Sequence, residues 1–218
     1  MKFDLHVHSA YSEDAEGKPE EIIRVLEKTD IDGLAFMDHN SIGGYERAKE
    51  IDTDLIIVPA MEVSTEKGHV MALGLQEEIG RMDSVRDAVD VIEDHGALPI
   101  AAHPFRFWSG IGKEETLKNH WAAIEGMNGR SWEHRNIQAR KLAEKMDLPV
   151  IGGSDSHRFK TLGKAYTVME DVATWQDVLD KIERGDTDVG GESRTFYQSF
   201  FYIRRAILGW MGRGFEKI

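Results

Sequence analysis

The sequence predicts an α/β fold in which helices cover a parallel sheet. Short apolar runs alternate with amphipathic stretches, and the connections between them are short, which is typical of repeated strand and helix units. Polar residues suited to chemistry follow the apolar runs, at the positions where parallel sheets carry their functional groups. The 218 residues suffice for one sizeable core, so we expect one domain over residues 1–190 and a tail over residues 191–218.

The first half of the chain alternates between expected strands and expected helices. Apolar runs predict strands at residues 3–7, 33–37, 55–63 and 68–75. A helix is expected to begin at Pro19, because proline favours the first helical position and apolar residues follow at helical spacing. Further helices are expected at 44–50 and at 83–96, the second of which has a capping residue and a terminal glycine.

The second half of the chain continues this alternation. Strands are expected at residues 97–102, 122–128, 148–153 and 164–169. Helices are expected at 131–146 and 174–184. No low-complexity segment or internal repeat divides the chain, which agrees with a single domain.

Composition excludes several classes of protein. There is no run of 18 apolar residues, and the N-terminus lacks the pattern of a secretory signal, so we expect a cytoplasmic protein without a transmembrane segment. The absence of cysteine excludes iron–sulfur clusters and thiolate zinc sites, so any metal must be bound by nitrogen and oxygen. The formal net charge of −12 argues against an extended nucleic-acid-binding surface.

Histidines and carboxylates gather where the expected strands end. His6 and His8 project from the same side of an extended chain, because side chains alternate along a strand, and both can therefore reach one ion. Asp155 and His157 repeat this spacing after the strand at 148–153. Asp38 is expected to orient a neighbouring ligand or a bound water. Imidazole and carboxylate together suit Zn²⁺, Mn²⁺ or Fe²⁺, so the sequence predicts a cluster of divalent ions.

Five segments of the chain carry a resemblance to a known family. They are DLHVHSAYSED, MDHNSIGG, MEVSTEKGHVMALG, AAHPF and GSDSH, in this order. Together they resemble the PHP (polymerase and histidinol phosphatase) family of metal-dependent phosphoesterases, from Asp4 to about His157. The resemblance implies a distorted (β/α)7 barrel that holds two or three divalent ions.

The resemblance also implies which residues bind each ion. The first ion would be held by His6, His8, Glu62 and Asp155. Glu62 would bridge to a second ion, held also by His103 and with His69 as an additional candidate. A third ion would be held by Asp14, His39 and His157, with Glu13 as the competing candidate for the position of Asp14.

The expected chemistry is attack of water on phosphorus. A water that bridges two divalent ions is acidic enough to be hydroxide near neutral pH, and the ions neutralise the phosphoryl oxygens. Arg106 and Arg158 follow the histidines of AAHPF and GSDSH, where a guanidinium could grip a phosphate. No serine, threonine or cysteine stands out as a nucleophile, which favours direct attack over a covalent intermediate.

We therefore expect a stand-alone metal-dependent phosphoesterase that hydrolyses a small phosphate monoester, such as a nucleotide or metabolite phosphate. One alternative is an exonuclease or phosphodiesterase acting on short oligonucleotides, and another is a non-catalytic metal-binding regulatory domain. The aromatic and locally basic tail at 191–218 is expected to pack on the domain, with a membrane surface or an oligomer contact as alternatives. The sequence leaves the oligomeric state open.

Overall fold

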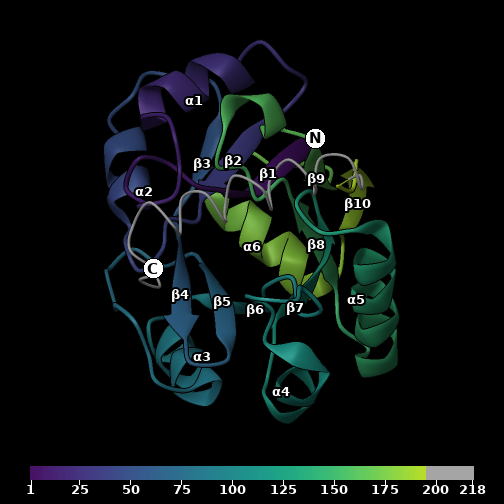
Figure 1. Ribbon diagram of the computed structural model, residues 1–218. Helices are drawn as coiled ribbons and strands as arrows, with labels where there is room; N and C mark the ends of the chain where they lie inside the picture. The colour runs from purple at the N-terminus through teal and green to yellow at the C-terminus, as the bar shows by residue number, and fades with distance from the viewer. Residues whose placement is uncertain (195–218) are drawn as a thin grey trace, which may run out of the picture.

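The computed structural model describes residues 1–194, which form two five-stranded sheets with helices packed around them (Figure 1). The first sheet has the order β10-β9-β1-β2-β3, and the second has the order β4-β5-β6-β7-β8. In Figure 1 the first sheet lies in the upper part of the molecule with α1 and α2, and the second lies in the lower part with α3 and α4. The expected α/β class is therefore confirmed.

The first sheet is parallel at one side and antiparallel at the other. Its strands are β1 (Lys2–Val7), β2 (Gly33–Phe36), β3 (Ile56–Val58), β9 (Ala165–Val168) and β10 (Asp188–Gly191). Strands β1, β2 and β3 pair in parallel, whereas β9 pairs antiparallel with both β1 and β10. The second sheet has the same mixed character. Its strands are β4 (Ala60–Thr65), β5 (Gly68–Leu73), β6 (Leu98–Ala101), β7 (Ala123–Asn128) and β8 (Val150–Gly153).

The expectation of an all-parallel sheet was wrong at the β4-β5-β6 segment. Strand β5 pairs antiparallel with both β4 and β6, and only β6, β7 and β8 run in parallel. The β4–β5 connection is too short for a helical crossover, so the chain makes a hairpin, with Thr65 opposite Gly68. The alternation of apolar and amphipathic segments along the sequence does not reveal the antiparallel direction of β5, because β5 is as apolar as the parallel strands.

The single strand expected at 55–63 is two strands that belong to different sheets. Proline at position 59 lacks the N–H that a continuous ladder requires, and the chain leaves the first sheet after Val58 and enters the second at Ala60. This break carries Glu62 across to the second sheet. Residue Glu62 then forms an isolated parallel bridge with His39, which follows β2 of the first sheet.

The hydrogen-bonded ladders of residues 1–194 form two sheets and do not close into a barrel, so the structure shows a mixed α/β fold. Two isolated bridges connect the sheets, one between Val7 and Ser156 and the other between His39 and Glu62. Both sheets also contribute to one apolar core, in which Phe3 of β1 lies with Ile151 of β8. The two bridges lie at the strand ends that carry the chemical residues.

Apart from α4, the helices described lie close to the positions that the sequence predicts. They are α1 (Pro19–Leu26), α2 (Gly43–Ala48), α3 (Val85–Asp94), α4 (Gly112–Lys118), α5 (Glu133–Met146) and α6 (Trp175–Arg184). Helix α6 begins at a capping box between Thr174 and Asp177 and ends at Gly185, whose φ of 73° suits glycine. Helix α4, the 3₁₀ turn at Phe159–Thr161 and β10 were not predicted, and α4 has a single buried residue, Thr116, so it lacks an apolar period.

Within residues 1–194, no helix combines the length and the apolar character that a membrane span requires. The expected packing of the tail falls on residues 195–218, which lie outside the described part of the chain. The boundary expected after residue 190 falls inside the last described strand, β10, which ends at Gly191.

Candidate metal centre

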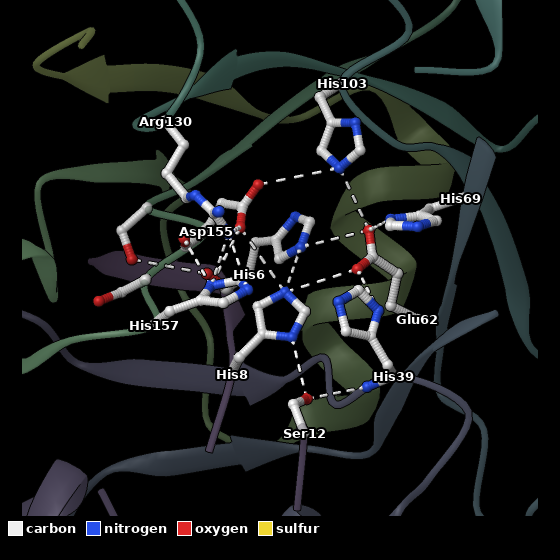
Figure 2. A network of polar contacts seen from close by, with 12 residues as sticks. His6, His8, Ser12, His39, Glu62, His69, His103, Arg130, Asp155 and His157 are labelled. Atoms are coloured by element: carbon white, nitrogen blue, oxygen red, sulfur yellow. Dashed lines mark hydrogen bonds and ion pairs between the residues drawn. The ribbon is translucent and has the colours of Figure 1, made fainter. Parts of the chain in front are cut away.

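Six histidines and two acidic residues gather at the strand ends where the two sheets meet (Figure 2). The set consists of His6, His8, His39, Glu62, His69, His103, Asp155 and His157. In Figure 2 the imidazoles of His6 and His8 occupy the middle, with Glu62 on one side and Asp155 on the other. The sequence prediction brought together residues that are up to 151 positions apart, from His6 to His157, and the fold places them in one cluster.

Glu62 is the residue with which most of these imidazoles make contact. Its Oε1 lies 3.1 Å from His69 Nδ1 and 3.2 Å from His103 Nε2. Its Oε2 lies 3.1 Å from His39 Nδ1 and 3.5 Å from His8 Nε2. The carboxylate is almost fully buried, and burying a charge in this way requires compensating partners. Glu62 is therefore placed to bridge two cations.

Asp155 forms the opposite side of the cluster. Its Oδ1 lies 3.6 Å from His8 Nε2 and 3.5 Å from His157 Nδ1. The same carboxylate pairs with two guanidinium groups, Arg106 at 2.6 Å and Arg130 at 3.0 Å. Asp155 has a φ of 51°, a left-handed conformation that non-glycine residues adopt at some cost. The backbone is thus bent so that the carboxylate turns back into the cluster.

The hydrogen bonds behind His6 and His8 fix which ring nitrogen faces the cluster. His6 Nδ1 lies 2.9 Å from Glu125 Oε1, to which it donates. His8 Nδ1 lies 3.2 Å from Ser12 Oγ, whose own proton is donated to Asp38 Oδ1 at 2.9 Å. Because Ser12 donates its proton to Asp38, it accepts from His8 Nδ1–H, and both histidines turn Nε2 toward the cluster.

Asp38 therefore acts through its neighbours and does not itself contact the clustered imidazoles through a described hydrogen bond. It accepts hydrogen bonds from the backbone N–H and the hydroxyl of Ser9 and from Ser12. Gly44 packs against it so closely that a Cβ there would lie 2.1 Å from Asp38 Oδ2. This carboxylate holds the loop after β1 and contacts His8 indirectly, through Ser12, while its orienting role stays a prediction.

The donor set fits divalent cations. Four groups of three residues bring ligand atoms within 4.8 Å of one another, and they are His6–His8–Asp155, His6–Glu62–His103, His39–Glu62–His69 and His8–His39–His157. Nδ1 of His39 and Nδ1 of His69 are buried and make no hydrogen bond, although each lies 3.1 Å from a Glu62 oxygen. Polar atoms of this kind are nearly always satisfied, and a cation between imidazole and carboxylate would satisfy both.

The charges in the cluster are strongly coupled. Burial alone would raise the pKa of Glu62, but the facing imidazoles, His69 first among them, hold that pKa well below its ordinary value. Burial likewise opposes ionisation of Asp155, yet Arg106 and Arg130 hold its pKa well below the usual range. Both carboxylates are therefore anionic at neutral pH and ready to bind cations.

The imidazoles divide into two kinds. Burial lowers the pKa of His8 well below the ordinary value, and the facing His157 adds to this effect. Burial and then the charge of Arg106 lower the pKa of His103 to about 4. For His6 burial also opposes the charge, but the surrounding carboxylates, Glu125 first, outweigh it and raise the pKa well above its ordinary value. His8 and His103 are therefore neutral at pH 7, whereas His6 keeps its proton and would have to release it before it could hold a cation.

Asp14 rather than Glu13 reaches the cluster. Asp14 Oδ2 lies 3.0 Å from His157 Nε2, and Oδ1 lies 3.8 Å from His39 Nε2. Glu13 is exposed, and none of the described hydrogen bonds or ion pairs connects it with these histidines. The geometry therefore supports Asp14 as the partner of His39 and His157.

The structure separates the two arginines that the sequence singled out. Arg106 pairs with Asp155, whereas the Nε of Arg158 lies 3.7 Å from Glu16 Oε1 and its side chain is 45% exposed. Arg130 lies in the cluster instead, within 3.0 Å of Asp155 Oδ1 and 2.7 Å of His157 Nε2. Its position follows β7, and the rule that strand ends carry the chemistry would have pointed to it.

Glu125 is the second residue that sequence reasoning missed. It lies inside β7, is fully buried, and accepts from the His103 backbone N–H at 2.7 Å as well as from His6. Asn128, at the end of the same strand, donates to both Glu125 and Asp155 at 3.0 Å. A glutamate inside an otherwise apolar strand was the available signal, because such a residue is buried only when it is paired.

Comparison with known proteins gives a consistent result. A model of the PHP domain matches residues 4–101, and a PHP-associated model matches residues 133–187. An uncharacterized protein of Methanocaldococcus jannaschii, MJ1587, is 32% identical over 117 residues, which cover 48% of this chain and 68% of that protein.

Two solved structures show the same fold. One is a two-domain protein of Bacteroides vulgatus that contains a predicted PHP-like metal-dependent phosphoesterase, with a TM-score of 0.72, 18% identity, and coverage of 88% of this chain and 65% of that one. The other is an amidohydrolase of Chromobacterium violaceum with bound sulfate and no metal, with a TM-score of 0.64, 17% identity, and coverage of 84% and 97%. With its motifs, its clustered imidazoles and these matches, the chain belongs to the PHP domain family.

Proposed function

We propose that the protein is a metal-dependent phosphoesterase that hydrolyses a small phosphate monoester. The observation that carries this proposal is the arrangement around Asp155, whose one carboxylate lies against both imidazoles that could hold cations and two guanidinium groups. Phosphoryl transfer requires both features, since cations must neutralise the phosphoryl oxygens while the ester is held in line.

Two or three divalent ions, Mn²⁺, Zn²⁺ or Fe²⁺, are the proposed cofactors. His6, His8 and Asp155 would hold one ion, and Glu62 would join it to a second near His103 and His69. The third would lie among Asp14, His39 and His157. When bound, such ions neutralise phosphoryl oxygens and lower the pKa of a water enough for it to attack phosphorus near neutral pH. The bridges between the sheets also support interpreting the fold as the distorted (β/α)7 barrel that the resemblance implies.

The chain's own residues supply positioning. Arg106 and Arg130 are 19% and 18% exposed, so each guanidinium reaches solvent while it remains paired with Asp155. Guanidinium groups suit phosphate oxygens, so Arg106 and Arg130 are the candidates to hold the phosphate. Arg158 was assigned the same role from the sequence, but its pairing with Glu16 makes it the weaker candidate.

The proposed function is tested by assaying metal-loaded protein on two related esters. Elemental analysis of the purified protein comes first, followed by assays of p-nitrophenyl phosphate and bis-p-nitrophenyl phosphate with added Mn²⁺. Hydrolysis of the monoester that is lost in Asp155→Ala supports the proposal. Preferential hydrolysis of the diester would instead favour an exonuclease or phosphodiesterase.

Two further outcomes would overturn the proposal. Metal-loaded protein that hydrolyses neither ester nor a panel of nucleotides would favour a non-catalytic metal-binding domain. Activity on amides alone would favour amide hydrolysis, the activity in the description of the Chromobacterium violaceum neighbour as an amidohydrolase.

A further inference from the structure

Two aromatic side chains are exposed beside the candidate metal centre. Phe107 is 84% exposed and Trp108 is 73% exposed, the two highest values among the large hydrophobic side chains described. Their ring centroids lie 5.0 Å apart, with an interplanar angle of 53°. Exposed apolar side chains that occur singly are ordinary, but an adjacent aromatic pair beside a polar site is typical of a binding surface.

The exposure of this pair does not result from a loosely held loop. The loop that carries it, residues 104–110, is fixed at its start by the Arg106 N–H, which donates to His103 O at 2.9 Å. At the other end Gly110 N–H donates to Arg106 O at 3.2 Å, and Ser109 O accepts from His69 N–H at 3.2 Å. The loop is therefore anchored on both sides of the two rings.

Close packing beneath the loop supports the same conclusion. Gly68 has a φ of +139°, and a Cβ there would lie 2.6 Å from Ser109 O, so the β4–β5 turn and the loop fit only with glycine at this position. Neither anchor involves a ring of the pair. The backbone thus holds Phe107 and Trp108 outward in a defined place.

The loop borders the open side of the cluster. His6, His8, Glu62, His103 and Asp155 are all almost fully buried. His39 and His69 are partly exposed, at 24% and 22% of their side chains. The loop touches both this accessible edge, through Ser109 and His69, and the Asp155 side, through Arg106. The loop that carries the aromatic pair therefore borders the exposed edge of the cluster.

We propose that Phe107 and Trp108 determine specificity by stacking on a planar aromatic or heteroaromatic ring in the alcohol part of the phosphate ester. This inference rests on the proposed function and names the substrate class for it. The two rings follow Arg106 directly in sequence, so their Cα atoms lie about 4 to 7 Å from that of Arg106. This spacing suits an ester whose phosphate meets Arg106 while its ring meets the loop.

The observations favour a small substrate over a polymer or a lipid surface. Aromatic side chains stack on many kinds of ring, and a nearby guanidinium can bind the phosphate of the same small molecule. The chain has a formal net charge of −12, which disfavours a polyanionic partner over a large area. Nucleobases and phenyl groups share the required chemistry, and the experiment below distinguishes them.

The test compares ring-bearing and ring-free esters in the metal-loaded full-length protein. Adenosine 5′-monophosphate and ribose 5-phosphate differ by the base alone, and phenyl phosphate and glycerol phosphate provide the aryl comparison. We expect the ratio of kcat/KM between ring-bearing and ring-free esters to fall about 5- to 100-fold in Trp108→Ala and in the double variant with Phe107→Ala. Trp108→Phe, which keeps a ring, should restore most of the ratio.

The control is Leu117→Ala, since Leu117 is 45% exposed on the neighbouring helix α4 and belongs to no proposed site. It should leave the ratio unchanged. A loss of equal size on both kinds of ester in Trp108→Ala would overturn the inference, because it would indicate a merely structural role. If the kcat/KM ratio falls only for adenosine monophosphate against ribose 5-phosphate, the substrate ring is a nucleobase. If it falls only for phenyl phosphate against glycerol phosphate, the substrate ring is a phenyl group.

A binding measurement separates this inference from the proposed function. The difference in fluorescence between the wild type and Trp108→Phe isolates the emission of Trp108, which adenosine monophosphate should quench and ribose 5-phosphate should not. Quenching without hydrolysis of any ester would overturn the proposed function and leave the ring-binding role intact. Hydrolysis of the nucleotide without quenching, and with an unchanged ratio in Trp108→Ala, would overturn the ring-binding role alone.

Discussion

The Nε2 atoms of His6 and His8 lie 3.1 Å apart in the buried middle of the cluster. On the opposite side of each ring Nδ1 already has an acceptor, Glu125 for His6 and Ser12 for His8. Two ring nitrogens therefore converge on one region, where the proton that the raised pKa of His6 keeps on Nε2 can be donated to the lone pair of His8 Nε2, and where a cation would replace that proton. Asp155 and Glu62 complete that region with carboxylate oxygens.

We predict that Glu125→Gln weakens metal binding about 10- to 100-fold, the usual effect of losing the partner of a metal-ligating histidine. Glutamine offers one acceptor oxygen where Glu125 now serves both His6 and the His103 backbone N–H. Competition with a chromophoric chelator measures the affinity. Glu114→Gln, at an exposed carboxylate on α4, is the matched control, and equal affinities in both variants would exclude a role for Glu125.

We predict that Arg106→Met lowers kcat/KM for p-nitrophenyl phosphate about 10- to 100-fold, because a charge-assisted hydrogen bond to phosphate is lost. Arg158→Met should stay within about twofold of the wild type, since that guanidinium pairs with Glu16. Steady-state kinetics on metal-loaded protein give both values. A larger loss in Arg158→Met than in Arg106→Met would reverse the assignment made here.

We predict that Asp14→Asn reduces the number of tightly bound ions, whereas Glu13→Gln does not. Asp14 is the carboxylate within reach of His39 and His157, and the amide of asparagine is a poorer ligand for a divalent cation. Elemental analysis after extensive dialysis measures the stoichiometry. The same stoichiometry in Asp14→Asn and the wild type would show that His39 and His157 bind without this carboxylate.

We predict that the metal-free protein gains stability from His103 as the pH rises from about 4 to about 6.5. The pKa of His103 is lowered to about 4 in the folded state, so over this interval the unfolded chain binds more protons than the folded one. The contribution of His103 to the free energy of unfolding is therefore fully present above the ordinary histidine pKa and is lost as the pH falls through about 4. The full shift corresponds to roughly 3 kcal/mol.

The measurement is urea unfolding of chelator-treated protein at several pH values, for the wild type and for His103→Asn. Asparagine does not titrate, so the difference between the two curves isolates His103 from the other buried groups. A difference that does not change with pH would refute the prediction.

The sequence by itself determined the α/β class, most helix positions and nearly all of the clustered residues. These features are local, since apolar periodicity, caps and the HVH and SDSH spacings depend on neighbours along the chain. Even the family could be identified from the order of the motifs. Asp38 was singled out as an orienting residue, which stays a prediction, but its partner, Ser12, was not foreseen.

Tertiary structure alone decided how the strands pair and which polar residues meet. The break at Pro59 and the antiparallel β5 depend on hydrogen bonds between distant segments, so an apolar run looks the same in either arrangement. Arg130 reaches Asp155 and Arg158 does not, although both follow strand ends, because the direction of a loop side chain is set by what packs around it. The role of Glu125 also depends on tertiary structure, because its partners, His6 and the His103 backbone N–H, come from distant segments of the chain.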